Sequence, residues 1–299
     1  MTNKVLISVL NYNNYHATKK CVESILKYLN SGEQIYIVDN NSSDDSFNLL
    51  KETFTNIKVV KSNFNEGYAA GHKISVDYAI NNNFELIWIL NNDLIVRENS
   101  LSELLKAYLN NGLGLYGSIT LKSEKPDIIN FGGGKTDDIS KPLDYNSYEN
   151  FSLKDYNNIT EFRAVQSIEG SSFIIPIKLI KKYGFMREDF FLYAEELDYC
   201  FYLKKHSIKS YIVPTSRVIH KGGESLKTNK YLEDYYRRRN FLFFMKKHYN
   251  QTVYSFVVRK IGLKNFFIFL IKKMIRLKDE NYYFNLASFH ALIKKTGKL

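Results

Sequence analysis

The chain has 299 residues, of which 44% are hydrophobic and 15% are aromatic, and its formal net charge is +11. This composition is typical of a globular protein with a sizeable core, and it excludes an intrinsically disordered chain. Residues 251–299 hold ten Lys or Arg and two Asp or Glu, so a net charge of +8 lies in this tail. The overall charge therefore says little about what the first 250 residues bind, and a nucleic-acid-binding hypothesis rests on the tail alone.

The two cysteines, Cys21 and Cys200, do not have the spacing of a zinc site. Two cysteines also cannot build a disulfide framework, which favours a cytoplasmic protein. The opening residues, MTNKVLISVL, lead directly into a strand-like segment, and we expect no secretory signal there. The longest late apolar stretch, Phe266–Ile271, is too short to cross a bilayer.

Strands and helices alternate regularly over the first 110 residues. In chain order, strand then helix, we predict them over Lys4–Leu10, His16–Leu29, Gln34–Val38, Phe47–Phe54, Ile57–Lys61, Gly67–Asn81, Leu86–Leu90 and Ser100–Asn110. Such an alternation predicts an α/β fold with a mixed, mainly parallel sheet that carries helices on both faces.

The pattern breaks after Ser123. Lys122–Thr160 is polar and without a clear period, and its length indicates a functional excursion. Further elements are predicted over Val165–Pro176, Ile177–Tyr183, Glu195–His206, Ser210–Val213 and Tyr231–His248. We therefore place one domain over residues 1–248 and a basic, amphipathic helical tail over residues 249–299.

Polar clusters follow each of the first four strands. They are Asn11-Tyr12-Asn13, Asp39-Asn40-Asn41, Asn63–Gly67 and Asn91–Asp93. In open α/β sheets ligands bind outside the carboxyl ends of the strands. Buried polar groups are costly unless something pairs with them. The clusters therefore predict a ligand site along this edge.

Asp93 ends the apolar run WILNND, where a carboxylate could hold Mg²⁺ or Mn²⁺ beside a diphosphate. The alternative is that Asn92 and Asp93 only shape a turn or cap a helix. Asp39 could accept a hydrogen bond from a base N–H or a ribose hydroxyl, or it could cap the following helix. Ser43, Asp44 and Asp45 can serve as that cap, which leaves Asp39 available.

The segment NEGYAAG opens a helix with Gly67 and Gly71, where small residues let a ligand or a neighbouring backbone approach closely. Neither GxGxxG nor GxxxxGK[ST] occurs, which argues against nicotinamide dinucleotides and a P-loop. In DFFLYAEELDYC, Glu195, Glu196 and Asp198 crowd a helix start. The helix dipole alone would favour acidic residues there, and the functional alternative is a general base of raised pKa.

His220, in RVIHKGGES, is a candidate ligand for a metal or a phosphate, although a lone histidine is more often structural or solvated. Arg237, Arg238, Arg239 and Asn240 lie together on a predicted helix. Two of these arginines could face a diphosphate, and the alternative is a solvated basic face.

Taken together, the motifs resemble glycosyltransferase family 2, and within it the rhamnosyltransferase-like members. The resemblance covers about residues 3–245 and rests on ordered segments, which are VLNYNN, IVDNNSSDDS, NEGYAAG, ILNNDL, EGSSFIIP, FLYAEELDYC, VIHKGGES and YYRRRNFLFF. It implies a GT-A fold, a nucleoside-diphosphate sugar donor linked to UDP or dTDP, a divalent metal and inversion at the anomeric carbon.

The resemblance also implies roles for single residues. Asn11 and Asp39 would hold the base, and Asp93 and His220 the metal. Glu196 matches the catalytic base position, with Glu195 as the alternative. The other implied donor or acceptor residues are Asn65, Gly71, Asn91, Asn92, Gly170, Ser171, Ser172, Arg239 and Asn240. Two departures from the family pattern are Asn-Asn-Asp at the metal motif, with a single carboxylate, and Glu-Glu at the base position.

We therefore expect an inverting glycosyltransferase, with dTDP-rhamnose as the first donor to test and a glycan or lipid-linked acceptor of cell-surface polysaccharide synthesis. The basic tail would bind the cytoplasmic face of an anionic membrane, or it would pack on the core or on a second copy of the chain. A non-catalytic carbohydrate-binding or membrane-associated module on the same scaffold is the alternative. A nucleotidyltransferase is disfavoured, because VLNYNNYH is not a basic phosphate loop.

Overall fold

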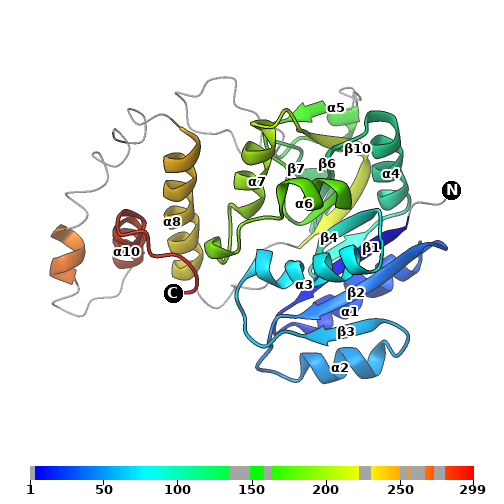
Figure 1. Cartoon of the computed structure of the whole chain (residues 1–299), viewed down its shortest axis with the longest axis horizontal. Helices are drawn as coiled ribbons and strands as arrows, with labels where there is room; N and C mark the ends of the chain where they lie inside the picture. Colours follow the sequence, from blue (N-terminus) through cyan, green and yellow to red (C-terminus); the bar gives the residue numbers. More distant parts are fainter. Residues whose placement is uncertain are drawn as a thin grey trace.

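The computed structural model describes residues 4–134, 149–157, 163–221, 230–249, 255, 267–272 and 280–299. These residues form a ten-stranded mixed sheet with helices on both faces, which confirms the predicted fold class (Figure 1). The strand order is β3-β2-β1-β4-β9-β6-β10-β5, with β7 paired to β6 and β8 paired to β10.

The first half of the sheet is parallel and follows the predicted alternation. Its elements are β1 (Val5–Asn11), α1 (Tyr15–Leu26), β2 (Glu33–Asp39), α2 (Ser46–Thr53), β3 (Lys58–Lys61), α3 (Tyr68–Asn81) and β4 (Leu86–Asn91). Successive side chains of a strand point to opposite faces. Val5 and Ile7 of β1 accordingly pack in the core under α1, and Leu6 packs in the core under α3.

The second half of the sheet mixes parallel and antiparallel pairs. Its elements are β5 (Leu94–Val96), α4 (Ser100–Asn111), β6 (Gly114–Lys122), β7 (Lys125–Phe131), α5 (Leu153–Asn157), β8 (Arg163–Val165), β9 (Ser172–Pro176), α6 (Ile177–Tyr183), η1 (Glu188–Phe190), α7 (Glu195–Lys204) and β10 (Lys209–His220). The predicted excursion Lys122–Thr160 contains β7 and α5, and its residues 135–148 and 158–160 lie outside the described residues.

Strand β10 extends seven residues beyond the predicted end at Val213, as far as His220. Its pairing with β6 jumps from Val213 opposite Ser118 to Arg217 opposite Ile119, so Pro214–Ser216 form a bulge. A bulge bends its strand and changes the direction of the next side chains. The residues after the bulge pair with β5, which places His220 opposite Leu94 and beside Asp93.

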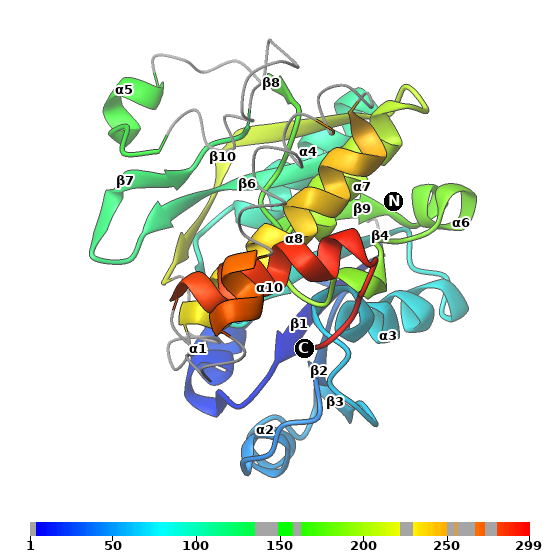
Figure 2. The same cartoon turned by 90° about the vertical axis from the view of Figure 1, so that its left-hand side faces the viewer.

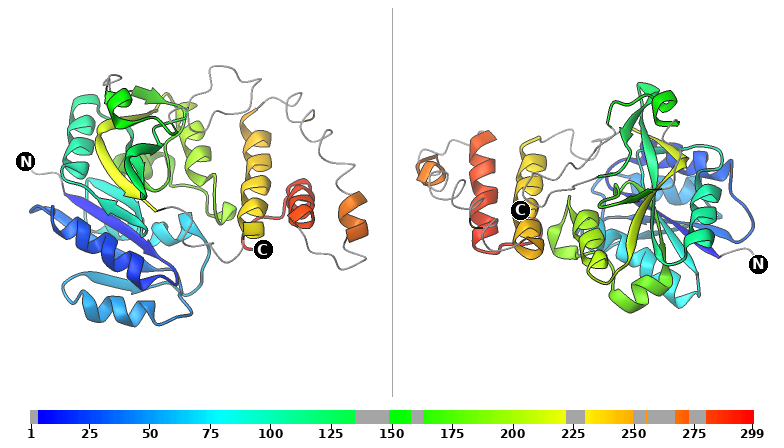
Figure 3. Two further views of the ribbon diagram at one scale, coloured as in Figure 1. Left: turned by 180° about the vertical axis from the view of Figure 1, so that it is seen from behind. Right: turned by 90° about the horizontal axis from the view of Figure 1, so that it is seen from above.

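Helix α8 (Lys230–His248) lies between α7 and α10 (Glu280–Leu292), as Figures 1 and 3 show. Helix α10 packs along α8, and residues 297–299 return toward the segment before α7 (Figure 2). The described end of the predicted tail thus packs on the main domain, whereas residues 250–254, 256–266 and 273–279 lie outside the described part. No helix in the described residues is long and apolar enough to cross a membrane.

Candidate functional site

The carboxyl ends of β1, β2 and β4 meet in a buried polar network. Asn11 Nδ2 donates to Asp39 Oδ2 (2.7 Å), and Ser42 donates to Asp39 through its backbone N–H (2.8 Å) and its hydroxyl (2.6 Å). Thr18 Oγ1 donates to Asn11 Oδ1 (2.6 Å) and accepts from Asn92 Nδ2 (2.9 Å). Asn11, Asp39 and Asn92 are buried, so the structure brings these predicted residues together but uses their side chains to bind one another.

Asp93 and His220 face each other at the start of β5 and the end of β10. Asp93 Oδ1 lies 3.2 Å from His220 Nε2, and Glu169 Oε1 lies 3.2 Å from His220 Nδ1 on the other side of the ring. Thr120 Oγ1 donates to Glu169 Oε2 (2.7 Å). The imidazole is thus held between two carboxylates, which fixes its orientation.

Glu169, His220 and Asp93 form a row of side chains in which each charge stabilises the opposite charge beside it. Burial lowers the pKa of His220, but the Glu169 carboxylate and then Asp93 outweigh it and raise this pKa from 6.5 to about 10. Burial raises the pKa of Glu169, but His220 and the hydrogen bond from Thr120 outweigh it and leave the pKa below its usual value. The row therefore holds a proton on His220 at neutral pH when no cation replaces it.

The donor set fits a divalent cation that binds through few protein ligands. Carboxylate oxygen and imidazole nitrogen from Asp93 and His220 lie close enough to share one ion. No group of three or more His, Cys, Asp or Glu that could hold a metal is found among the described residues. Mg²⁺ is usually bound by one or two carboxylates together with substrate phosphates, so a two-residue site is compatible with a nucleotide-bound ion.

The two glutamates at the start of α7 differ in their surroundings. Glu195 is 1% exposed, and burial, followed by the charge of Glu196, raises its pKa well above the usual value. Glu196 is 9% exposed and lies beside Gly170, where an added Cβ would be 3.5 Å from the Glu196 Cδ atom. Glu196 is therefore the carboxylate nearer to the segment that also carries Glu169.

Tyr68 joins the two sides of the site. Its hydroxyl donates to the carbonyl oxygen of Gly170. Burial raises the pKa of Tyr68 well above 10, and Glu196, Glu195 and Glu169 add to this effect in that order. Tyr68 therefore stays protonated among three acidic side chains.

The residues of NEGYAAG mostly stabilise the backbone at the start of α3. Asn65 Oδ1 accepts from Asn40 Nδ2 and from the Gly67 N–H (both 3.1 Å). A Cβ on Gly71 would lie 2.5 Å from Leu10 Cδ1, so close packing against Leu10 accounts for a glycine at this position. A Cβ on Gly67, whose φ is +99°, would lie 2.0 Å from the carbonyl oxygen of Phe191.

Ser171 and Ser172, two predicted acceptor residues, are buried. Ser172 Oγ accepts from Trp88 Nε1 (3.1 Å) and lies 2.8 Å from Ser118 Oγ, so this hydroxyl points into the core and away from the site. The carbonyl of Ser171 accepts from the N–H of Asn91 (2.9 Å), which ties β9 to the end of β4. Of the predicted Gly-Ser-Ser segment, Gly170 borders Glu196.

The resemblance implies that Arg239 and Asn240 bind the donor, whereas the structure places both side chains inside the protein. Both are 0% exposed. Arg239 donates to the carbonyls of Phe190 (2.6 Å) and Gly297 (2.7 Å), and Asn240 donates to the carbonyls of Phe190 (3.0 Å) and Leu192 (2.6 Å). Their donors are used inside the protein, because the chain segment before α7 folds back over α8.

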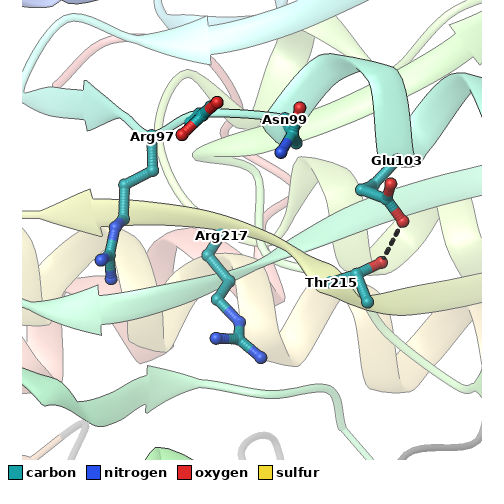
Figure 4. A pocket seen from close by; sticks show the side chains of 6 residues that line it. Arg97, Asn99, Glu103, Thr215 and Arg217 are labelled. Carbon is teal, nitrogen blue, oxygen red and sulfur yellow. Dashed lines mark hydrogen bonds between the residues drawn. The ribbon is translucent and has the colours of Figure 1, made fainter.

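A separate hollow of about 460 Å³ lies between β10, the first turn of α4 and the loop that precedes α4 (Figure 4). It is lined by Arg97, Glu98, Asn99, Glu103, Thr215 and Arg217. Thr215 donates to Glu103 Oε2 (2.7 Å), and the lining contains none of the residues predicted for the site.

Sequence reasoning missed Glu169 and Tyr68. Both lie inside the segments EGSS and NEGYAAG, of which only other residues were predicted for the site: Gly170, Ser171, Ser172, Asn65 and Gly71. The signal available for Glu169 was an acidic residue directly before a predicted site glycine. Its partner His220 is 51 residues away in sequence, so the pairing itself could not be inferred.

Comparison with known proteins gives matches over most of the chain. Residues 6–175 match the model of the family described as glycosyl transferase family 2. The low-salt glycan biosynthesis hexosyltransferase Agl10 of Haloferax volcanii is 22% identical over 217 residues, which cover 70% of this chain. The aligned region spans 64% of that relative's own length.

Two solved structures share the fold. GalNAc-T7 with UDP, GalNAc and Mn²⁺ has a TM-score of 0.61 at 15% identity, over 82% of this chain and 54% of that one. The mannosyltransferase PcManGT from Pyrobaculum calidifontis, in complex with GDP-Man and Mn²⁺, has a TM-score of 0.60 at 11% identity, over 99% of this chain and 87% of that one. At such identities the likeness shows the fold alone.

Proposed function

Because the chain belongs to glycosyl transferase family 2, we propose that it transfers a hexose from a nucleoside-diphosphate sugar to a hydroxyl of a glycan or lipid-linked acceptor. The fold is that of the GT-A glycosyltransferases, and the two solved structures with this fold hold UDP or GDP-Man together with Mn²⁺. The curated relative is named as a hexosyltransferase of glycan biosynthesis, which supports the same class of reaction.

The observation that carries this proposal is the position of Glu169 and Gly170. Glu169 contacts His220, which in turn contacts Asp93, and the next residue, Gly170, borders Glu196. The candidate metal ligands, Asp93 and His220, therefore lie beside Glu169. The candidate base, Glu196, lies beside the next residue of the chain. Transfer between a diphosphate-linked donor and a hydroxyl acceptor requires this pairing of functions at short range.

In the proposed reaction the acceptor hydroxyl attacks the anomeric carbon as the bond to the diphosphate oxygen breaks, with inversion of configuration. Glu196 accepts the hydroxyl proton as the new bond forms. Asp93 and His220 would hold Mg²⁺ or Mn²⁺, which when bound would offset the negative charge of the departing diphosphate. Glu169 orients His220 through the Nδ1 contact, as second carboxylates commonly do for metal-bound histidines.

The donor base and sugar are the finer part of the proposal. The resemblance to rhamnosyltransferase-like members makes dTDP-rhamnose the first donor to test, with UDP-sugars next. Asn11, Asp39, Asn65, Asn91 and Asn92 would shape the edge on which the nucleotide lies. Asn11 and Asp39 are buried and bind one another, so in this structure they support the edge from below.

Association with an anionic membrane is proposed for the tail. Helical residues 267–272 expose Phe267 (61%) and Ile271 (58%), next to Lys272, and residues 251–299 carry a net +8. Apolar and basic side chains together suit an interfacial helix. Sedimentation with anionic and with neutral vesicles tests this, and self-association without vesicle binding would instead indicate a homodimer.

The decisive experiment for the activity is a donor screen. Purified protein is mixed with Mn²⁺ or Mg²⁺ and a panel of dTDP-, UDP- and GDP-sugars, with and without EDTA, and nucleoside diphosphate release is followed. Release from one donor that EDTA abolishes would support the proposal and identify the sugar. If no donor is hydrolysed and none binds by calorimetry, the non-catalytic alternative is favoured.

A further inference from the structure

The segment that leads into Glu195 and Glu196 has a strained backbone. Phe191, Tyr193 and Ala194 all have positive φ, at 70°, 70° and 72°, and none of them is glycine. Such conformations are strained and persist only where the surrounding structure imposes them. Residues 189–194, here called the base strap, must therefore be held in this shape by contacts with other parts of the chain.

The first set of contacts comes from α8. Asn240 Nδ2 donates to the carbonyls of Leu192 (2.6 Å) and Tyr193 (2.9 Å), and Arg239 Nη2 donates to the carbonyl of Phe190 (2.6 Å). Arg239 Nε also donates to Asn240 Oδ1 (3.0 Å), which fixes the amide. Two adjacent side chains of α8 thus bind three carbonyls of the base strap.

The second set comes from the far end of the chain. The N–H of Gly297 donates to the carbonyl of Asp189 (2.7 Å), and the carbonyl of Gly297 accepts from Arg239 Nη1 (2.7 Å). The N–H of Leu299 donates to the Tyr236 hydroxyl (2.8 Å). The planar guanidinium of Arg239 therefore bridges the base strap and residues 297–299 with one nitrogen each.

The base strap also contacts the other side of the site. The carbonyl of Phe191 accepts from the N–H of Tyr68 (2.7 Å), and it lies so close to Gly67 that no side chain fits there. Tyr68 in turn donates to Gly170, which borders Glu196. Displacement of the base strap would therefore move Glu196 and Tyr68 relative to Gly170.

We propose that Arg239 and Gly297 are positioning residues, through which residues 297–299 hold the base strap in the conformation that sets Glu196 against the acceptor hydroxyl. The proposal rests on the function assigned to Glu196 above. It explains why a guanidinium that could bind a diphosphate is fully buried, since its fork of donors is matched to carbonyls of two segments distant in sequence. Residues beyond 280 are on this basis part of the catalytic domain.

The test compares Gly297→Ala with Gly112→Ala. Both glycines have nearly the same positive φ, +75° and +76°, and neither has an atom within 4 Å of an added Cβ. An alanine is strained at both positions because of the positive φ, but of the two only Gly297 contacts the base strap. Arg239→Lys is the second variant, because it keeps the charge but one ammonium cannot replace the planar fork.

Hydrogen exchange followed by mass spectrometry measures the base strap directly. We expect amides of residues 189–196 to exchange about tenfold faster in Gly297→Ala and Arg239→Lys than in wild type, and to be unchanged in Gly112→Ala. With the donor found active in the screen, kcat should fall about tenfold to a hundredfold while the donor KM changes less than threefold, because misplacement of a reacting group by about 1 Å has this effect. Calorimetry of each variant corrects kcat for the folded fraction.

The outcomes separate this inference from the proposed activity. Unchanged exchange in both variants would overturn the positioning contacts, whether or not the protein turns over. Faster exchange with unchanged kcat would show that the base strap does not position the base. If the wild-type protein transfers no sugar, the proposed function fails, while exchange alone still decides whether residues 297–299 hold the strap.

Discussion

Replacing Gly67 by alanine should destabilise the protein more than the backbone conformation alone explains. Gly67 has φ +99° and ψ −168°, a region that costs an alanine about 1–3 kcal/mol. The added Cβ would also lie 2.0 Å from the carbonyl oxygen of Phe191, well inside van der Waals contact. Relieving this overlap requires the two segments to separate, which breaks the hydrogen bond from Tyr68 N–H to Phe191 and costs about 1 kcal/mol more.

Gly184→Ala provides a matched control for this variant. Gly184 has φ +81° and ψ 179°, and an added Cβ there meets nothing within 4 Å. Its alanine variant should lose only the conformational part of the free energy of unfolding. We expect Gly67→Ala to lose roughly 2–4 kcal/mol in total, at least about 1 kcal/mol more than Gly184→Ala.

Urea denaturation followed by circular dichroism and by the fluorescence of Trp88 measures both variants. Donor KM and kcat of Gly67→Ala, corrected for the folded fraction, then report the effect on the site. Equal free energies of unfolding for the two variants would refute the close contact between Gly67 and Phe191. The same result would also show that the start of α3 does not pack closely on the base strap at Phe191.

Three further predictions concern charged groups. Asp93→Asn should leave the circular dichroism spectrum unchanged but lower Mn²⁺-dependent kcat/KM about a thousandfold, and a variant with the wild-type rate and the wild-type Mn²⁺ requirement would contradict the metal assignment. Glu196→Gln should lower kcat about 10²–10⁴-fold and Glu195→Gln much less, and steady-state kinetics of both variants distinguishes the base. Burial raises the pKa of Asp198, but the hydrogen bond from His248 and other contacts with α8 outweigh it and lower the pKa. The stability contributed by this carboxylate is therefore present above its unfolded pKa of about 3.9 and is lost as pH falls, so urea midpoints between pH 3 and pH 6 should decline less steeply in Asp198→Asn than in wild type.

Hydrophobic periodicity predicts the strands and helices in the first half of the fold. It predicts the later strands only in part. The predicted strand Lys4–Leu10 differs by one residue at each end from the observed Val5–Asn11. In β10 the apolar pattern is interrupted by Pro214 and the polar residues after it, and the predicted strand therefore ends at Val213. A bulge is specified by pairing with β6, which single-sequence patterns do not contain.

The sequence could predict which residues belong to the candidate site, but it could not predict where their side chains point. The sequence singles out both Asp93 and His220, and the structure brings them within 3.2 Å. Arg239 and Asn240 have the side chains expected of a diphosphate site, yet their donors point to backbone carbonyls. Which face of α8 is buried depends on α10 and the base strap, and a local pattern cannot show this.

The bulge in β10 makes chain length a determinant of the site. Val213 and Arg217 pair with two consecutive residues of β6, and Pro214–Ser216 are three extra residues between them. Three is an odd number, so the alternation of side chains is inverted in the second half of the strand. One residue more or fewer would turn His220 to the opposite face, away from Asp93 and Glu169. Point substitutions at Thr215 should accordingly be tolerated where a single-residue insertion or deletion would not.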